Sequence, residues 1–273
     1  LFRPEANAAR FNRSADRLAM PQLPEDVFLD SIRKLVDIDR DWFPEVEGGS
    51  IYLRPFMIAS EVFLGVKPSS EYLYMVIASA AGGYFKSGAP AIKIWVSETY
   101  SRAAPGGTGA AKCGGNYAAS LVAQSEATAN GCDQVVFLDA AEQKWVEELG
   151  GMNLFFLFDD GRLITPPTGG TILEGITRDS ILTLAREQGL TVEERPYSVD
   201  QWQKDAESGK LTETFACGTA AVVTPVGTVQ SKSGSFTIGA GGPGQMTQQL
   251  RRQLTDIQRG TEADPRGWVQ RID

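Results

Sequence analysis

The sequence predicts an α+β chain of two domains, and three observations support this. Helix-like and strand-like segments are interspersed without a strict β-α-β alternation. The stretch 86–91 is small, polar and contains Gly and Pro, as domain connections do. The segments after this stretch are richer in strands than those before it. With 273 residues, 42% of them hydrophobic, the chain is long and apolar enough for two buried cores.

The predicted elements follow from hydrophobic periodicity. Apolar residues at helical spacing predict helices, and short alternating or continuous apolar runs predict strands. Helices are expected at 8–18, 25–39, 117–130, 178–188 and 245–258. Strands are expected at 51–59, 72–78, 91–97, 134–139, 144–147, 153–158, 212–216 and 221–226. In the first of these strands, a period of two places Tyr52, Arg54 and Phe56 on one face and Leu53 on the other.

Turn residues mark the ends of several elements. Asn116 is the expected N-cap of the third helix, and Gly131 is its expected stop. Gly175 precedes the fourth helix and Gly189 closes it. The tight segment 217–220 is flanked by two strands, which is typical of a hairpin turn.

Composition excludes several classes of function. The net charge of −8, with acids and bases mixed along the chain, argues against a nucleic-acid surface and against a polybasic membrane anchor. Small-molecule partners are therefore expected. Cys113, Cys132 and Cys217 match neither a disulfide framework nor a metal motif, and they fit a reducing cytoplasm. The longest apolar runs are far shorter than the roughly 20 residues that span a membrane.

The chain contains no histidine, so histidine-based triads, metal sites and proton shuttles are excluded, and no metal is expected. It also begins at Leu1 rather than at a methionine, and residues 1–4 read like the end of a strand. We therefore expect a preceding segment in the natural protein, which would belong to the first domain.

A glycine-rich stretch with one lysine, GGTGAAKCGGNYAAS at 106–120, leads into the third predicted helix. Its spacing matches neither the phosphate-binding P-loop nor the dinucleotide fingerprint. One interpretation is a flexible loop with a solvated lysine, as most lysines are exposed. The other is a reactive amine, because small neighbours let Lys112 approach a bulky ligand and lose hydration, which lowers its pKa.

Three further segments could bind an anion and a cation together. At 171–180 a glycine-led turn opens a helix, whose first N–H groups can point at a phosphate. At 217–220 a hydroxyl and N–H groups can form a compact nest. At 146–153 two adjacent acids precede two glycines, and a buried carboxylate there would need a cation or donors. An ordinary capped helix, a hairpin turn and a surface acid are the respective alternatives.

Taken in order, these segments resemble the branched-chain amino acid aminotransferases, which are pyridoxal-phosphate enzymes of fold type IV. The resemblance spans nearly the whole chain. Its motifs are RFNRSADRLAMP at 10–21, YLRP at 52–55, RAAPGGTGAAKCGGNY at 102–117, ELGGMNLF at 148–155, TPP at 165–167, ILEGITRDSI at 172–181, GTAAVVTPV at 218–226 and DIQRG at 256–260. It implies a small α/β domain at 1–85, a linker at 86–91, a larger pseudo-barrel domain at 92–273 and a homodimer.

The resemblance also implies the residues that bind the cofactor, pyridoxal 5'-phosphate. Lys112 would form the Schiff base and move the substrate proton. Glu148 would pair with the pyridine nitrogen, which leaves Glu147 as a solvated acid, and Glu147 is the alternative partner of this nitrogen. Tyr117 would lie on the O3′ side of the ring. The phosphate would be bound by Arg10, Ile176, Thr177 and Thr219.

The implied substrate contacts are Tyr52, Arg54, Tyr84, Arg102 and the backbone N–H of Ala220. Arg54 shares a strand face with aromatic residues. By the resemblance, one pocket there would bind both the apolar side chain of a branched-chain amino acid and the distal carboxylate of glutamate. Two departures are visible. Ala221 and Thr224 replace the cysteine pair that eukaryotic members often carry, so no thiol switch is expected. Gly151 replaces a threonine that some relatives use for carboxylate binding.

The implied activity is amino-group transfer between leucine, isoleucine or valine and 2-oxoglutarate, in branched-chain amino-acid biosynthesis. D-amino acid aminotransferase and aminodeoxychorismate lyase are alternatives within the fold type, because they would keep Lys112, Glu148 and the phosphate set. A non-catalytic small-molecule binder is a remote alternative.

Overall fold

The structure is a computed structural model that describes residues 1–46, 49–81 and 90–272. The chain forms two compact units. The first comprises Leu1–Lys86 with Ala263–Asp273, and the second comprises Ser87–Glu262. Residues 86–89 of the predicted linker lie outside the described residues.

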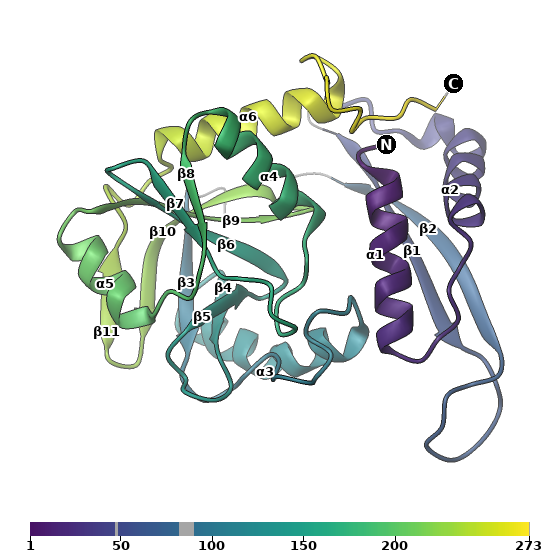
Figure 1. Cartoon of the computed structure of the whole chain (residues 1–273), viewed down its shortest axis with the longest axis horizontal. Helices are drawn as coiled ribbons and strands as arrows, with labels where there is room; N and C mark the ends of the chain where they lie inside the picture. The colour runs from purple at the N-terminus through teal and green to yellow at the C-terminus, as the bar shows by residue number, and fades with distance from the viewer. Residues whose placement is uncertain (47–48, 82–89, 273) are drawn as a thin grey trace. The chain divides into compact units, whose positions relative to one another are not determined.

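The first unit is a β-hairpin covered by two helices (Figure 1). Its elements are α1 Pro4–Arg17, α2 Glu25–Ile38, the short 3-10 helix η1 Arg40–Trp42, β1 Ser50–Ala59 and β2 Tyr72–Ala81. The strands pair antiparallel from Ser50 with Ala81 to Ala59 with Tyr72. Leu53 packs with the helices on the core around Phe28. The two predicted helices and both predicted strands are confirmed.

The C-terminal segment 263–273 belongs to the first unit, whereas the sequence led us to place it in the second. The backbone N–H of Arg3 donates to the Trp268 carbonyl at 2.6 Å. Phe2 packs edge-on against the Trp268 ring, with centroids 5.8 Å apart. The end of the chain thus returns to its beginning, a long-range contact for which the sequence carries no local signal.

The second unit is built on a nine-stranded sheet, counted over the described residues. Strand β9 pairs with both β10 and β6, so the path β10-β3-β4-β5-β6-β9 closes on itself like a barrel. The strands are β3 Ile92–Ser97, β4 Gln134–Leu138, β5 Val146–Leu149, β6 Met152–Phe158, β7 Arg162–Thr165, β8 Thr191–Glu194, β9 Leu211–Gly218, β10 Val222–Ser231 and β11 Gly234–Thr237. The predicted α+β class and barrel-like second domain are confirmed.

Four helices pack around this sheet: α3 Gly114–Ala129, α4 Ile176–Glu187, α5 Val199–Glu207 and α6 Gln245–Arg259. Every residue of β6 is buried, and the Phe155 ring stacks on Phe215 of β9 at 5.0 Å. The carboxylate of Glu213, also on β9, accepts hydrogen bonds from the backbone N–H groups of Met246 and Thr247. This contact ties the start of α6 to the barrel.

Some predicted boundaries are wrong. The strand expected at 144–147 lies at 146–149, because the Asp139 carboxylate holds the preceding residues in a turn by accepting four backbone N–H groups. Helix α3 begins at Gly114 with Cys113 as its N-cap, so Asn116 is not the cap and its side chain is buried. Gly131 and Gly189 have positive φ at the helix ends, as expected of stops. Elements β7, β8, β11 and α5 were not predicted.

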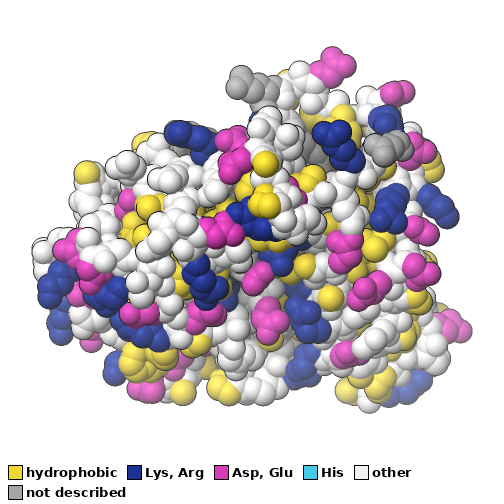
Figure 2. Space-filling model, turned by 45° about the horizontal axis from the view of Figure 1, so that its top comes forward, with side chains coloured by type: hydrophobic (Ala, Val, Ile, Leu, Met, Phe, Trp, Pro, Cys, Tyr) yellow, Lys and Arg dark blue, Asp and Glu magenta, His cyan; other side chains and the backbone are white. Residues whose placement is uncertain are grey.

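On the face seen in Figure 2, basic and acidic side chains are interspersed, in keeping with the mixed charge pattern of the sequence. No helix among the described residues is long and apolar enough to cross a membrane. The same residues contain no group of three or more Cys, Asp or Glu placed to hold a metal ion.

Candidate active site

Lys112 lies at the end of the glycine-rich loop, two residues before α3 begins. Its side chain is exposed, and its Nζ lies 3.1 Å from the hydroxyl of Tyr117 in the first turns of α3. The amine is also 5.7 Å from the centre of the Tyr117 ring. The structure therefore brings together two of the residues singled out in the sequence.

Glu148, on β5, is a buried carboxylate with only 1% of its surface exposed. Its Oε1 accepts the backbone N–H of Leu173 at 2.8 Å and the Asn153 amide at 3.2 Å. Burial raises the pKa of Glu148 to about 7, and the neighbouring Arg102 partly opposes this rise.

Arg102 is the counter-ion of Glu148. Its Nη2 lies 2.9 Å from Glu148 Oε2, and both side chains are almost fully buried. The same nitrogen donates to the carbonyls of Thr171 and Gly109. Arg102 Nη2 and Glu148 Oε2 are close enough for an ion pair, but their geometry is not that of a hydrogen bond. Among the described residues, Oε2 therefore has no hydrogen-bond donor. Oε2 is thus a buried acceptor that can receive a further N–H.

Glu147 is also buried, which corrects the expectation of a solvated acid. Its Oε1 accepts the hydroxyl of Thr171 at 2.6 Å, and burial raises its pKa. The physical reason is that β5 lies between β4 and β6, and all four residues of β5 are buried. Adjacent strand residues point to opposite faces, so two covered faces bury both acids.

These side chains line one pocket of the second unit. The lining residues are Arg102, Ala111, Lys112, Asn116, Tyr117, Glu148, Gly150, Gly151 and Leu173. Gly151 faces the Tyr117 ring, because a Cβ at this position would lie 3.2 Å from the ring. A threonine at this position would need the ring to shift.

The first turn of α4 begins directly after the segment that contacts Glu148. Ile176 and Thr177 are buried there, behind the N-cap Gly175, whose lack of a side chain leaves the helix without a side-chain cap. The first N–H groups of a helix have no partner within the helix, and they favour an anion. A Cβ at Gly175 would lie 2.2 Å from Asn153 Oδ1, so glycine is required at this close approach.

Thr219 and Ala220 are exposed in the turn between β9 and β10. Cys217, two residues before Thr219, pairs with Asn153 in the sheet. Because Asn153 also donates to Glu148 and to the Leu173 carbonyl, this residue links the turn, the carboxylate and the segment that leads to α4.

The remaining predicted site residues lie in the first unit. Arg10 is buried on α1 and donates to Asn7 at 2.9 Å. On β1, the Arg54 guanidinium lies 5.4 Å from the centre of the Tyr52 ring, which confirms that these two residues share a face. Tyr84 lies outside the described residues.

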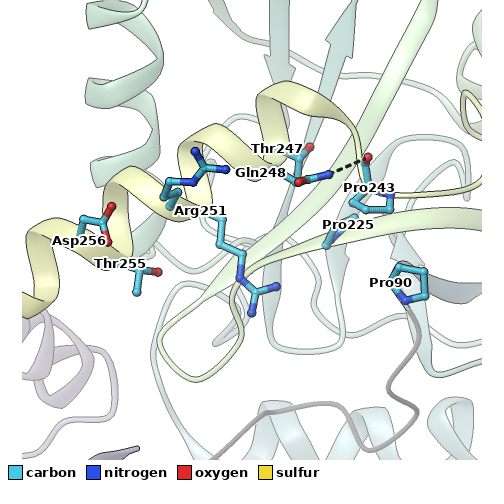
Figure 3. Close-up of a pocket in the computed structure, with 9 residues that line it drawn as sticks. Pro90, Pro225, Pro243, Thr247, Gln248, Arg251, Thr255 and Asp256 are labelled. Carbon is cyan, nitrogen blue, oxygen red and sulfur yellow. Dashed lines mark hydrogen bonds between the residues drawn. The ribbon is translucent and has the colours of Figure 1, made fainter. Parts of the chain in front are cut away.

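A larger cavity of about 420 Å³ lies along α6 (Figure 3). Its lining is Pro90, Pro225, Pro243, Thr247, Gln248, Arg251, Arg252, Thr255 and Asp256. These residues include neither a lysine nor a buried carboxylate. The smaller pocket around Lys112 is therefore the better candidate for an active site.

Comparison with known proteins identifies the family. Residues 1–229 match the family model described as amino-transferase class IV. The chain belongs to the class IV aminotransferases. Among these it is 59% identical over 276 aligned positions to the branched-chain-amino-acid aminotransferase of Mycolicibacterium smegmatis, covering 100% of this chain and 75% of the relative. It is 55% identical to the corresponding Mycobacterium tuberculosis protein, over 99% of this chain and 75% of the relative. The chain is thus a member of the branched-chain amino acid aminotransferase group, as the motifs indicated.

Solved structures of class IV aminotransferases have the same fold. The Escherichia coli branched-chain amino acid aminotransferase superposes with a TM-score of 0.83 at 31% identity, covering 100% of this chain and 84% of the other. The T.th. enzyme of the same name, solved with pyridoxamine 5'-phosphate, superposes with a TM-score of 0.84 at 32% identity and the same coverage. That enzyme was also solved with N-(5'-phosphopyridoxyl)-L-glutamate, at a TM-score of 0.82 and 31% identity over the same shares of the two chains.

The sequence did not reveal every residue of the pocket. The pairing of Arg102 with Glu148, the contact of Thr171 with Glu147 and the N–H of Leu173 were all missed. Thr171 and Leu173 lie in the segment 171–180 that was noted for its helix start, so proximity to that motif was the one available signal.

Proposed function

We propose that this chain is a pyridoxal-phosphate-dependent transaminase, which moves the amino group between leucine, isoleucine or valine and 2-oxoglutarate. The proposal is supported by membership of the branched-chain aminotransferase group and by relatives solved with pyridoxamine phosphate and with a phosphopyridoxyl-glutamate adduct. The main structural support is that the buried Oε2 of Glu148 lacks a hydrogen-bond donor among the described residues, in the pocket that Lys112 also lines.

The residues of the second unit fit this cofactor. Pyridoxal phosphate presents an aldehyde, a phenolic oxygen, a ring nitrogen and a phosphate dianion. Lys112 offers the amine, Tyr117 a hydroxyl and Glu148 a buried acceptor for a ring N–H. The first turn of α4 and the hydroxyl of Thr219 offer donors for the phosphate. When bound, the cofactor supplies an electron sink for the negative charge that develops at the substrate Cα.

In this proposal the side chains have separate tasks. Lys112 Nζ would take the proton from the substrate Cα and pass it to the C4′ carbon of the cofactor. Tyr117, 3.1 Å away, holds the amine by a hydrogen bond. Glu148 would favour the protonated ring nitrogen by accepting the hydrogen bond of its N–H at Oε2, and the nearby Arg102 favours the charged form of Glu148. We therefore assign Arg102 a role through Glu148 in place of the substrate contact that the resemblance implied.

The first unit contributes the other predicted residues to this proposal. Arg10 is proposed as a phosphate ligand because an arginine binds a dianion strongly. Ile176, Thr177 and Thr219 are the proposed phosphate ligands of the second unit. Tyr52 and Arg54 contact the substrate side chain, where the guanidinium can bind the distal carboxylate of glutamate. Tyr84 stays a proposed substrate contact, and the N–H of Ala220 binds the α-carboxylate.

We also propose a homodimer that works in the cytoplasm. The loop between β1 and β2 exposes Val62, Leu64 and Val66 completely, and an apolar tip of this kind is suited to a second copy of the chain. All three cysteines are free in the structure, as expected in a reducing compartment.

A substrate panel tests the proposed activity. The purified chain is loaded with pyridoxal phosphate and assayed with L-leucine, L-isoleucine, L-valine and D-alanine as donors and 2-oxoglutarate as acceptor. We expect turnover with the three branched-chain L-amino acids. Activity with D-alanine and none with L-leucine would favour a D-amino acid aminotransferase instead. Lys112→Arg should abolish turnover, whereas Lys210→Arg, a change at an exposed lysine, should not.

A further inference from the structure

We propose that Asn116 is a positioning residue for Lys112, which fixes the direction in which the lysine side chain leaves the loop. This inference rests on the proposed function of Lys112. It concerns a residue that the sequence suggested only as a helix cap.

The Asn116 side chain turns back from α3 onto the glycine-rich loop. Its Nδ2 donates to the carbonyls of Thr108 and Ala111, both at 2.8 Å. Its Oδ1 accepts the Thr108 hydroxyl at 2.7 Å. Only 7% of the residue is exposed, and both of its N–H donors are used within this one loop.

One of these bonds reaches the peptide unit immediately before the lysine. The Ala111 carbonyl that accepts Asn116 also accepts the backbone N–H of Cys113 at 3.1 Å. This closes a three-residue turn with Lys112 at its centre, and Lys112 does not have a positive φ. The turn is therefore of the common inverse γ type. Asn116 holds the carbonyl on which this turn depends.

The loop before the lysine is anchored at several other points. The N–H of Ala110 donates to the Gly170 carbonyl at 3.0 Å, and Arg102 donates to the Gly109 carbonyl. The exposed lysine side chain itself has four rotatable bonds. The backbone at 111–113 sets the point and the direction from which this side chain starts, and Asn116 ties that backbone to the start of α3.

The chemistry of the side chain makes the role testable. Asn116→Asp keeps the shape but loses both N–H donors and places a carboxylate oxygen against two carbonyls. Asn116→Ala removes the side chain, and Thr108→Val removes only the hydroxyl bond. Asn130→Asp is a matched control at the other end of α3, where the amide makes a single hydrogen bond to the Glu126 carbonyl. The proposed phosphate site on α4 is untouched in every variant.

Three measurements are made on each protein with pyridoxal phosphate: its dissociation constant, the pH midpoint of its visible absorption, and the rate at which borohydride fixes it to Lys112, located by peptide mapping. For Asn116→Asp and Asn116→Ala we expect a dissociation constant within about threefold of wild type. We expect the midpoint to move by at least about half a pH unit and fixation at Lys112 to slow about tenfold, since small misplacements of a reacting group are costly. Thr108→Val should show a smaller change in the same direction, and Asn130→Asp none.

A purely structural role would lower the melting temperature and leave the absorption midpoint and the fixation rate unchanged, and that result would overturn the proposal. If Asn116→Ala does not fold, Asn116→Asp and Thr108→Val decide the question by the same criteria. If borohydride fixes pyridoxal phosphate to a residue other than Lys112 in the wild-type protein, the proposed function is overturned as well. Wild-type fixation at Lys112 with unchanged Asn116 variants overturns only the positioning role.

Discussion

Arg102 and Glu148 form a buried ion pair, with Nη2 of the arginine 2.9 Å from Oε2 of the carboxylate. The pair joins the loop after β3 to β5, and it sets the charge at the back of the Lys112 pocket. A buried pair of this kind need not add net stability, but loss of one partner leaves an uncompensated charge. Substitution of one partner alone should therefore have a larger effect than substitution of both.

Removal of the arginine should destabilise the chain strongly. Arg102→Met leaves the Glu148 carboxylate buried without its counter-ion, so we expect the free energy of unfolding in urea to fall by about 3–5 kcal/mol. The double variant with Glu148→Gln should lose clearly less than the sum of the two single changes. As a control, Arg186→Met removes an exposed ion pair with Glu194 and should cost less than about 1 kcal/mol. Equal effects of the two arginine changes would contradict a buried pair.

Stability of the cofactor-free chain should fall as the pH rises through the titration of Glu148. Its pKa is raised from 4.5 to about 7 by burial, so the folded chain binds the proton more tightly than the unfolded chain. The stabilisation of the folded chain by this proton is therefore fully present below pH 4.5 and is lost between pH 4.5 and 7. The free energy of unfolding changes by up to about 3 kcal/mol over this range. Glu147 acts with the same sign, because its pKa is also raised.

The measurement is the free energy of unfolding of wild type and Glu148→Gln from pH 5 to 8. Glutamine does not titrate, so the variant should show a shallower decline. Identical slopes in the two proteins would show that Glu148 does not titrate in this range. Glu147→Gln serves as the comparison for the adjacent acid.

Gly175→Ala should disturb the link between α4 and Glu148. The added Cβ would lie 2.2 Å from Asn153 Oδ1, and Asn153 donates to Glu148. We expect a loss of about 1–3 kcal/mol in unfolding free energy from overpacking, together with weaker binding of pyridoxal phosphate. Gly169→Ala is the matched control, because a Cβ there meets no atom within 4 Å. Indistinguishable behaviour of the two alanine variants would argue against the close approach.

Arg54→Met should weaken the binding of glutamate and 2-oxoglutarate more than the binding of leucine. The guanidinium lies over the Tyr52 ring on the exposed side of β1, and a methionine keeps the apolar stem without the charge. We expect KM for glutamate and 2-oxoglutarate to rise about tenfold, and KM for leucine to change less than about threefold, since one charge-assisted hydrogen bond is lost. Arg33→Met, on the exposed surface of α2, is the control. An equal rise in KM for leucine would contradict the assignment of Arg54 to the distal carboxylate of glutamate.

The periodic elements could be predicted from sequence, whereas several of the short ones could not. Amphipathic helices such as α2, and long apolar strands such as β6, carry a repeat that spans several turns or pleats. Strand β8 has only four residues, TVEE, without a clear alternation, and its position is decided by parallel pairing with β7. Helix α5 carried a usable sign in Ser198, whose side chain caps the helix by accepting the N–H of Gln201.

The contacts in the Lys112 pocket also divide into those that the sequence predicts and those that it does not. Lys112 and Tyr117 are close in sequence, so their proximity follows from a loop that enters a helix. The partner of Glu148 could not be predicted, because Arg102 reaches it from a distant part of the chain. Glu147 was misjudged because burial on both faces of β5 depends on β4 and β6, which no local pattern reveals.

Lys112 is the residue that we propose to carry pyridoxal phosphate in this chain. The most direct measurement is reduction of the loaded protein with borohydride, followed by digestion and mass spectrometry of the labelled peptide. We expect one phosphopyridoxyl group per chain, attached to Lys112, and its loss in Lys112→Arg. A label on another lysine, or no label in protein that otherwise folds normally, would contradict it.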